Sequence, residues 1–374
     1  MTMMQHRRVR YIGLDVHKAT IAVAIAEEEG SPSSYGTIAN DPDAVRKLMR
    51  QLGGKGVDLQ VAYEAGPTGY ALHRQLTKLG ITCMVVAPSL IPVRPGDKVK
   101  TDRRDALKLA RLLRSGDLTA IWVPDREHEA LRNLVRTRAD AKVDELRAKH
   151  RLSKFLLRLG VHPPVGMRNW SLRYFQWLRQ VEFEHLADRI VFGDYLAEVT
   201  AAGERIKRLE AALQQCAESS SQLRLIRALQ AFRGIGFLSA VTIVAEVGTL
   251  RRFRTAPQLM AYAGAVPSES SSGSKQHRGA ITKSGNSLLR HVLGEAAHHA
   301  RHAPRVGGLL KRRQQDLPRE VIELAWRAQV RLHHRYRHLA ARIGVHKTLT
   351  AVGRELAGFV WAMGQVLETV PAAA

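Results

Sequence analysis

Cysteine is scarce in this chain of 374 residues, which contains only two. Cys83 and Cys216 lie far apart and show no metal-ligand spacing. A disulfide framework and a cysteine-rich structural zinc site both require several cysteines at regular spacings. The sequence therefore predicts neither.

Long hydrophobic runs are also missing. The longest apolar stretch, residues 235–245, is too short for a bilayer, which needs about 20 apolar residues. The basic start at residues 5–10 resembles a signal peptide, but the apolar run behind it is broken by Asp15, His17 and Lys18. We therefore expect an intracellular, cytoplasmic protein without a membrane partner.

Acidic residues are few in comparison with basic ones. The chain contains 34 Asp and Glu against 58 Lys and Arg, which gives a net charge of +24. A basic excess of this size is typical of proteins that neutralise phosphates. It favours a nucleic-acid partner, although charge alone does not distinguish this from a merely basic protein, such as one bound to ribosomes.

Four acids are placed where a metal site would need them. Asp15 and Glu64 each end a short apolar strand pattern, at residues 11–15 and 59–64. Asp102 and Asp105 open a helical stretch, and their i, i+3 spacing puts both on one helix face. Carboxylate oxygens are preferred ligands of hard divalent cations. We therefore expect these four residues to hold Mg²⁺ or Mn²⁺ and to act in phosphodiester chemistry.

The first region, residues 1–124, has a mixed pattern. Strands are expected at 11–15, 20–26, 35–39, 59–63 and 82–86, and helices near 42–52, 69–79 and 102–113. Asp41-Pro42 is a typical helix start, with Asp as the N-cap. The order β-β-β-α-β-α-β-α is that of a ribonuclease-H-like α/β domain, and the four acids fall at its catalytic positions.

The middle region, residues 125–225, is predicted to be helical. Two runs with helical spacing surround a turn region at His162-Pro163-Pro164. They are expected to form long exposed helices, either paired as an antiparallel coiled coil or folded as an ordinary helical insert. Trp170, Tyr174, Phe175 and Trp177 could stack on bases, but aromatic residues at this spacing are more often part of a core.

The last region, residues 226–374, begins with a glycine-rich turn. Residues 229–240 resemble a helix-hairpin-helix, whose backbone amides could bind phosphate, but a plain interhelical turn fits equally well. Between residues 249 and 313 the only acids are Glu269 and Glu295 among many Lys and Arg. This imbalance predicts a face that binds nucleic acid, through the residues Arg251, Arg252, Lys275, Arg278, Lys283, Asn286 and Arg290.

A serine- and glycine-rich segment lies inside this basic stretch, at residues 267–286. Serine and glycine favour a mobile loop and let the backbone approach a ligand. Spacing alone does not make any of these serines a nucleophile.

Four motifs together resemble the DEDD-motif transposases, which are RuvC-like recombinases of bacterial insertion sequences related to the Piv invertases. They are Ile12-Gly13-Leu14-Asp15-Val16-His17-Lys18, Tyr63-Glu64-Ala65, Lys100-Thr101-Asp102-Arg103-Arg104-Asp105-Ala106, and Ala261-Tyr262-Ala263-Gly264 followed by Ser272-Gly273 and Lys283-Ser284-Gly285-Asn286. The resemblance implies a metal-dependent DNA recombinase with a RuvC-like N-terminal domain, a coiled-coil middle and a mainly helical C-terminal transposase domain.

The same resemblance implies several details. Ser272 would be the nucleophile, with Ser270 and Ser271 as alternatives because the serine run makes the register ambiguous. The protein would act as a homo-oligomer, a dimer or tetramer, in which one subunit's metal site joins another's serine. Its partners would be the DNA of the element ends and target and a structured guide, or bridge, RNA. It would be associated with the bacterial nucleoid.

Three other functions are compatible with parts of the sequence. A junction-type nuclease would use the four carboxylates without a serine intermediate. An actin-like sugar kinase shares the core and the Ile12-Gly13-Leu14-Asp15 pattern, but it needs Gly-Thr or Gly-Ser where this chain has His17-Lys18. A nonenzymatic binding protein would carry the four acids as ordinary surface residues.

Overall fold

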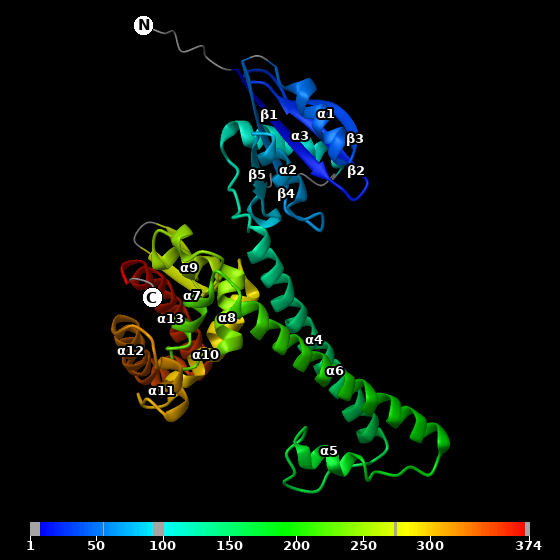
Figure 1. Ribbon diagram of the computed structural model, residues 1–374, viewed down its shortest axis with the longest axis vertical. Coiled ribbons are helices and arrows are strands. Elements are labelled where there is room, and N and C mark those ends of the chain that lie inside the picture. Colours follow the sequence, from blue (N-terminus) through cyan, green and yellow to red (C-terminus); the bar gives the residue numbers. More distant parts are fainter. Residues whose placement is uncertain (1–7, 55, 93–100, 273–274, 371–374) are drawn as a thin grey trace. The chain divides into compact units, whose positions relative to one another are not determined.

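A computed structural model describes residues 8–54, 56–92, 101–272 and 275–370 (Figure 1). The chain forms two compact units, residues 1–123 and 124–374. Each unit has its own hydrophobic core. Among the described residues, no helix combines the length and the apolar character needed to span a membrane.

The first unit is built on a five-stranded sheet of order β3-β2-β1-β4-β5. The strands are β1 (Arg8–Val16), β2 (Thr20–Ala26), β3 (Ser33–Ala39), β4 (Val57–Glu64) and β5 (Thr82–Val86). β1, β2 and β3 pair antiparallel, whereas β4 is parallel to both β1 and β5. The predicted order of strands and helices is confirmed.

Helices cover both faces of this sheet. They are α1 (Pro42–Leu52), α2 (Ala71–Lys78) and α3 (Asp102–Ser115), with a short 3-10 turn η1 (Pro88–Leu90). The Asp41 side chain caps α1 by accepting hydrogen bonds from the backbone N–H of Asp43 and Ala44, as the Asp-Pro pattern predicts. α1 and α2 share one core with the sheet, and α3 packs on the other face through Ala106 and Leu109.

The contact between α3 and β1 is unusually close because of Gly13. A β-carbon at this position would lie 2.2 Å from the Ala106 carbonyl oxygen and 2.4 Å from the Ala110 nitrogen. Both atoms belong to the backbone of α3, so the helix can rest on the strand only while this residue has no side chain. This approach places the start of α3 beside the end of β1.

The second unit contains a long pair of helices, α4 (Arg126–Arg158) and α6 (Leu186–Glu218), which lie side by side in Figure 1. Ion pairs join Arg138 to Glu210 and Arg151 to Glu198. As the residue number rises along α4, the number of its partner on α6 falls, so the helices run antiparallel. The predicted pairing of these two helices is confirmed.

In the sequence, the segment between α4 and α6 contains α5 (Leu172–Leu178), which belongs to a small aromatic core with the adjoining ends of the two helices. Tyr174 is buried there, and Trp170, Phe175 and Trp177 pack against the same core. These aromatic rings therefore serve packing. At the other end of the pair, Leu131 and Leu213 belong to the core of the C-terminal region. A domain boundary near residue 225 stays a prediction.

The C-terminal region is mainly helical, as predicted. α8 (Phe237–Val247) is its most buried helix, with residues 243–247 all inside the core. Around it lie α7 (Leu223–Leu229), η2 (Leu250–Arg252), α9 (Ala256–Tyr262), α10 (Ser287–Ala297), η3 (His298–Arg301), α11 (Gly308–Gln314), α12 (Arg319–Ile343) and α13 (Val345–Thr369). A two-stranded hairpin of β6 (Pro267–Ser272) and β7 (Lys275–Ile281) lies between α9 and α10 in the sequence.

Candidate functional site

Two acids that are distant in the sequence meet at the edge of the first unit. Asp15 lies near the end of β1, and Asp102 is the first residue of α3. The N-cap Thr101 fixes this helix start, because its hydroxyl accepts a hydrogen bond from the Arg104 N–H at 3.3 Å. The close packing permitted by Gly13 then brings the two carboxylates near each other.

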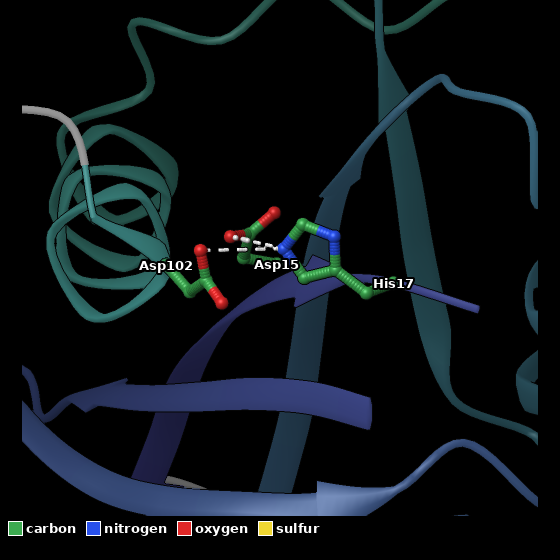
Figure 2. A group of neighbouring side chains, drawn as sticks. All are labelled: Asp15, His17 and Asp102. Atoms are coloured by element: carbon green, nitrogen blue, oxygen red, sulfur yellow. Dashed lines mark hydrogen bonds and ion pairs between the residues drawn. The ribbon is translucent and has the colours of Figure 1, made fainter. Parts of the chain in front are cut away.

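His17 lies between these carboxylates (Figure 2). Its Nε2 atom is 3.2 Å from Asp15 Oδ2 and 3.4 Å from Asp102 Oδ1. Ligand atoms of the three residues all lie within 4.8 Å of one another. Among the described residues, this is the group of His, Cys, Asp and Glu side chains that could hold a metal ion.

Glu64 and Asp105 lie near this group but outside its closest atoms. In the parallel register of β1 and β4, Gly13 is opposite Ala62 and Leu14 is opposite Tyr63. Alternate residues of a strand share a face, so Asp15 and Glu64 point toward the side covered by α3. Asp105 lies one turn into α3, and its charge acts on Asp15.

The electrostatics of Asp15 fit a cation site. Burial raises the pKa of the Asp15 carboxyl, His17 lowers it, and the negative charges of Asp102 and Asp105 raise it further. The net pKa is above the ordinary value, so the ionised form is disfavoured here. A divalent cation would reverse this balance, and carboxylate oxygens suit hard cations.

Ser270, Ser271 and Ser272 lie in the strand β6 and not in the mobile loop that the composition predicts. Ser272 ends β6, where it is opposite Lys275 in the hairpin. Ser270, Ser271 and Ser272 are exposed, and the Ser271 hydroxyl donates to Glu269 at 3.0 Å. Backbone pairing with β7 holds these residues in an extended strand, which their composition does not indicate. Gly273 and Ser274 lie outside the described residues.

Comparison with known proteins relates both ends of the chain to transposases. A model of DEDD transposases of the IS110 type matches residues 12–161, and a model described as "Transposase IS116/IS110/IS902 family" matches residues 226–309. The chain is 43% identical to a putative transposase, y4qE, of Sinorhizobium fredii over 96% of this chain and 89% of that protein. The chain belongs to the IS110 family of transposases.

Further relatives have the same description. The transposase for insertion sequence element IS1533 of Leptospira borgpetersenii is 31% identical over 89% of this chain and 97% of its own length. The transposase for insertion sequence element IS1111A of Coxiella burnetii is 24% identical over 78% of this chain and 73% of its own. The similarity therefore covers both units of this transposase.

The basic residues that the sequence selects lie in different environments. Arg278 pairs with Glu269 and Arg251 with Glu368, both at the surface, while Lys283 is exposed and has a positive φ of 55°. The Arg252 guanidinium lies 4.3 Å from the ring centroids of both Phe253 and Tyr262. The side chain of Lys275 is outside the described residues. Contacts between these residues and phosphate stay predictions.

Asn286 and Arg290 hold the structure of the transposase together. The Asn286 side chain caps α10 by accepting from the Leu289 N–H at 2.9 Å, and it donates to Glu246 at 2.5 Å. Arg290 donates to the Ala263 carbonyl at 2.8 Å. Both residues therefore have structural partners near the base of the serine hairpin.

Glu246 is a central residue that sequence reasoning missed. Its side chain is 1% exposed and pairs with Arg136 of α4 through two hydrogen bonds of 2.7 and 2.8 Å. It therefore joins the long helix α4 to the Asn286 cap of α10. One signal was available, because Glu246 is the only charged residue in the apolar helix α8.

The glycine-rich turn at residues 229–240 packs against the C-terminal helices. Gly234 has φ 92°, and a β-carbon there would lie 2.6 Å from the Ala296 carbonyl oxygen. Ala231 and Phe232 are buried, and Gln314 donates to the Ala231 carbonyl at 3.1 Å. These contacts fix the turn between α7 and α8, and phosphate binding by its backbone amides stays a prediction.

Proposed function

We propose that this transposase cleaves and rejoins DNA strands at a divalent-metal site held by Asp15, Glu64, Asp102 and Asp105, with Ser272 as the nucleophile. The observation that carries the metal site is the meeting of Asp15 and Asp102 from two distant segments. Two carboxylates this close repel each other, and a divalent cation held between them would offset that repulsion.

The four acids would each contribute carboxylate oxygens to Mg²⁺ or Mn²⁺. Such an ion, when bound, supplies positive charge that stabilises the oxygens of a phosphodiester undergoing displacement. The sheet order and the position of Asp15 and Glu64 on neighbouring strands support a ribonuclease-H-like arrangement.

Ser272 would serve the strand-transfer step. Its Oγ attacks phosphorus and loses its proton, a phosphoserine bond forms, and the sugar oxygen leaves as a hydroxyl. The reverse reaction with a second DNA hydroxyl restores the serine, so no outside energy is needed for rejoining. The exposure of Ser272 at the end of β6 supports this role, because a nucleophile must reach its substrate.

The partners follow from the same proposal. The net charge of +24 suits DNA and a structured guide RNA. A homo-oligomer would let the serine of one subunit act at the metal site of another.

The experiment uses DNA of an element end and its target with purified full-length protein. Asp15→Asn and Asp102→Asn are expected to abolish strand exchange, as does excess EDTA, while Asp43→Asn, an exposed acid on α1, stays active. Ser272→Ala should keep DNA binding and lose the covalent adduct that a denaturing gel and peptide mass spectrometry detect in the wild type.

Each other outcome has a defined meaning. Recombination by Asp102→Asn or in excess EDTA contradicts the metal site. An adduct on Ser270 or Ser271 moves the nucleophile by one or two positions. A fully active Ser272→Ala without any adduct replaces the serine mechanism by hydrolysis at the carboxylates alone.

A further inference from the structure

We infer that His17 is a ligand of the divalent ion at this site and makes the site prefer Mn²⁺ over Mg²⁺. The inference rests on the proposed function, in which Asp15 and Asp102 hold the ion. It adds a nitrogen donor to a set that otherwise consists of carboxylate oxygens.

The backbone of His17 is fixed independently of any ion. Its N–H donates to the Thr20 carbonyl at 2.8 Å, and its carbonyl accepts from the Asn40 side chain at 2.7 Å. These bonds close the turn between β1 and β2 and tie it to the end of β3. The imidazole is therefore held at the carboxylates by the fold of the sheet.

The spacing of the donor atoms fits a shared ion. Ligands on adjacent positions of an octahedral ion, with bonds of about 2.1 Å, are about 3 Å apart. His17 Nε2 lies 3.2 Å from one carboxylate oxygen and 3.4 Å from the other. A surface histidine that only pairs with an acid needs a single partner, whereas this one faces two acids from different elements (Figure 2).

The surroundings leave one side of the site accessible. The His17 side chain is 50% exposed and that of Asp102 is 65% exposed, while Asp15 is 19% exposed. The three residues thus form a shallow group on which an ion could also bind water or a phosphate oxygen. Catalytic sites require such an open position.

The nitrogen donor determines the expected ion preference. Mn²⁺ is the weakest nitrogen binder of the first-row transition metals, but as a member of that series it accepts an imidazole ligand more readily than Mg²⁺, which prefers oxygen ligands and keeps several waters. Removal of His17 should therefore weaken Mn²⁺ binding much more than Mg²⁺ binding.

The test measures ion binding by the full-length protein without a recombination assay. Mn²⁺ is titrated and followed by electron paramagnetic resonance, Mg²⁺ by competition, and pulsed spectroscopy detects ¹⁴N coupled to bound Mn²⁺. His17→Ala is compared with His162→Ala, the same change at an exposed histidine of the helical middle. Asp15→Asn and Asp102→Asn report on the carboxylate site itself.

The expected result is a ¹⁴N signal in the wild type and His162→Ala that His17→Ala lacks. Mn²⁺ affinity should fall at least roughly tenfold in His17→Ala, since losing even a group that supports a metal ligand has an effect of this size. Mg²⁺ affinity should change by less. A ¹⁴N signal that survives in His17→Ala, or an unchanged Mn²⁺ affinity, overturns the inference.

The two proposals fail in different ways. If both aspartate variants lose Mn²⁺ but His17→Ala binds it normally, the carboxylate site stands and His17 is only a hydrogen-bonding neighbour. If the aspartate variants bind Mn²⁺ as tightly as the wild type, the proposed metal site and the His17 inference both fail.

Discussion

Replacing Gly13 with alanine tests whether the close packing of α3 on β1 builds the site. The added methyl group would lie 2.2 Å from the Ala106 carbonyl oxygen, more than 1 Å short of the 3.4 Å at which ordinary contact begins. The Ala110 nitrogen, at 2.4 Å, belongs to the same helix backbone, so no side-chain rotation relieves the clash. α3 must move away from the sheet by about 1 Å to recover ordinary contact.

The cost follows from this displacement. Overpacking a core typically costs about 1–3 kcal/mol of folding free energy. We expect the upper end, about 3 kcal/mol, because the atoms that the new methyl group meets belong to the α3 backbone and cannot rotate away. For a unit of this size, that lowers the melting temperature by roughly 10 °C. Metal–ligand distances in well-formed sites lie within about 0.2 Å of their ordinary values. A shift of Asp102 by about 1 Å should therefore reduce the free energy of Mn²⁺ binding by more than it reduces the free energy of unfolding.

The assay combines thermal unfolding with Mn²⁺ titration. Gly54→Ala is the matched control, because it lies in the same unit and a β-carbon there meets nothing within 4 Å. The control should stay within about 0.5 kcal/mol of the wild type. If Gly13→Ala unfolds at the same temperature as Gly54→Ala and binds Mn²⁺ as tightly as the wild type, the site does not depend on the close packing of α3 on Gly13.

Other predictions concern the second unit. Burial alone would raise the pKa of Glu246, but hydrogen bonds from Arg136 and Asn286 more than offset it, so the folded pKa is lowered. The stability that this lowered pKa contributes is fully present when the pH is above the pKa of Glu246 in the unfolded chain. It is lost as the pH falls through the pKa of Glu246 in the folded protein. Glu246→Gln should therefore flatten the acid side of the stability curve and destabilise the second unit by about 1–3 kcal/mol, measured by denaturant unfolding across pH 3–7; an unchanged curve would contradict it. Replacing Lys275, Arg278 and Lys283 with Gln should each reduce the log–log salt slope of DNA binding by about one unit, with Arg46→Gln on α1 as control. A slope unchanged by all three would place the nucleic-acid surface elsewhere.

Local signals explain what the sequence predicted correctly. The short apolar runs of β1 and β2, the Asp41-Pro42 start of α1 and the helical spacing of α4 are all signals between near neighbours in the sequence. The order of elements in the first unit follows from such signals, and so does the selection of Asp15 and Asp102 as strand-end and helix-start acids.

Tertiary structure decided the features that depend on distant residues. The role of Gly13 appears only when α3 packs on it, and His17 becomes part of the acid group only when β1, β2 and α3 assemble. The serine hairpin and the Glu246 network likewise depend on partners that composition does not reveal. The spacing of apolar residues indicates which face of a helix or strand is buried. Contacts between segments depend instead on how their backbones pack in three dimensions.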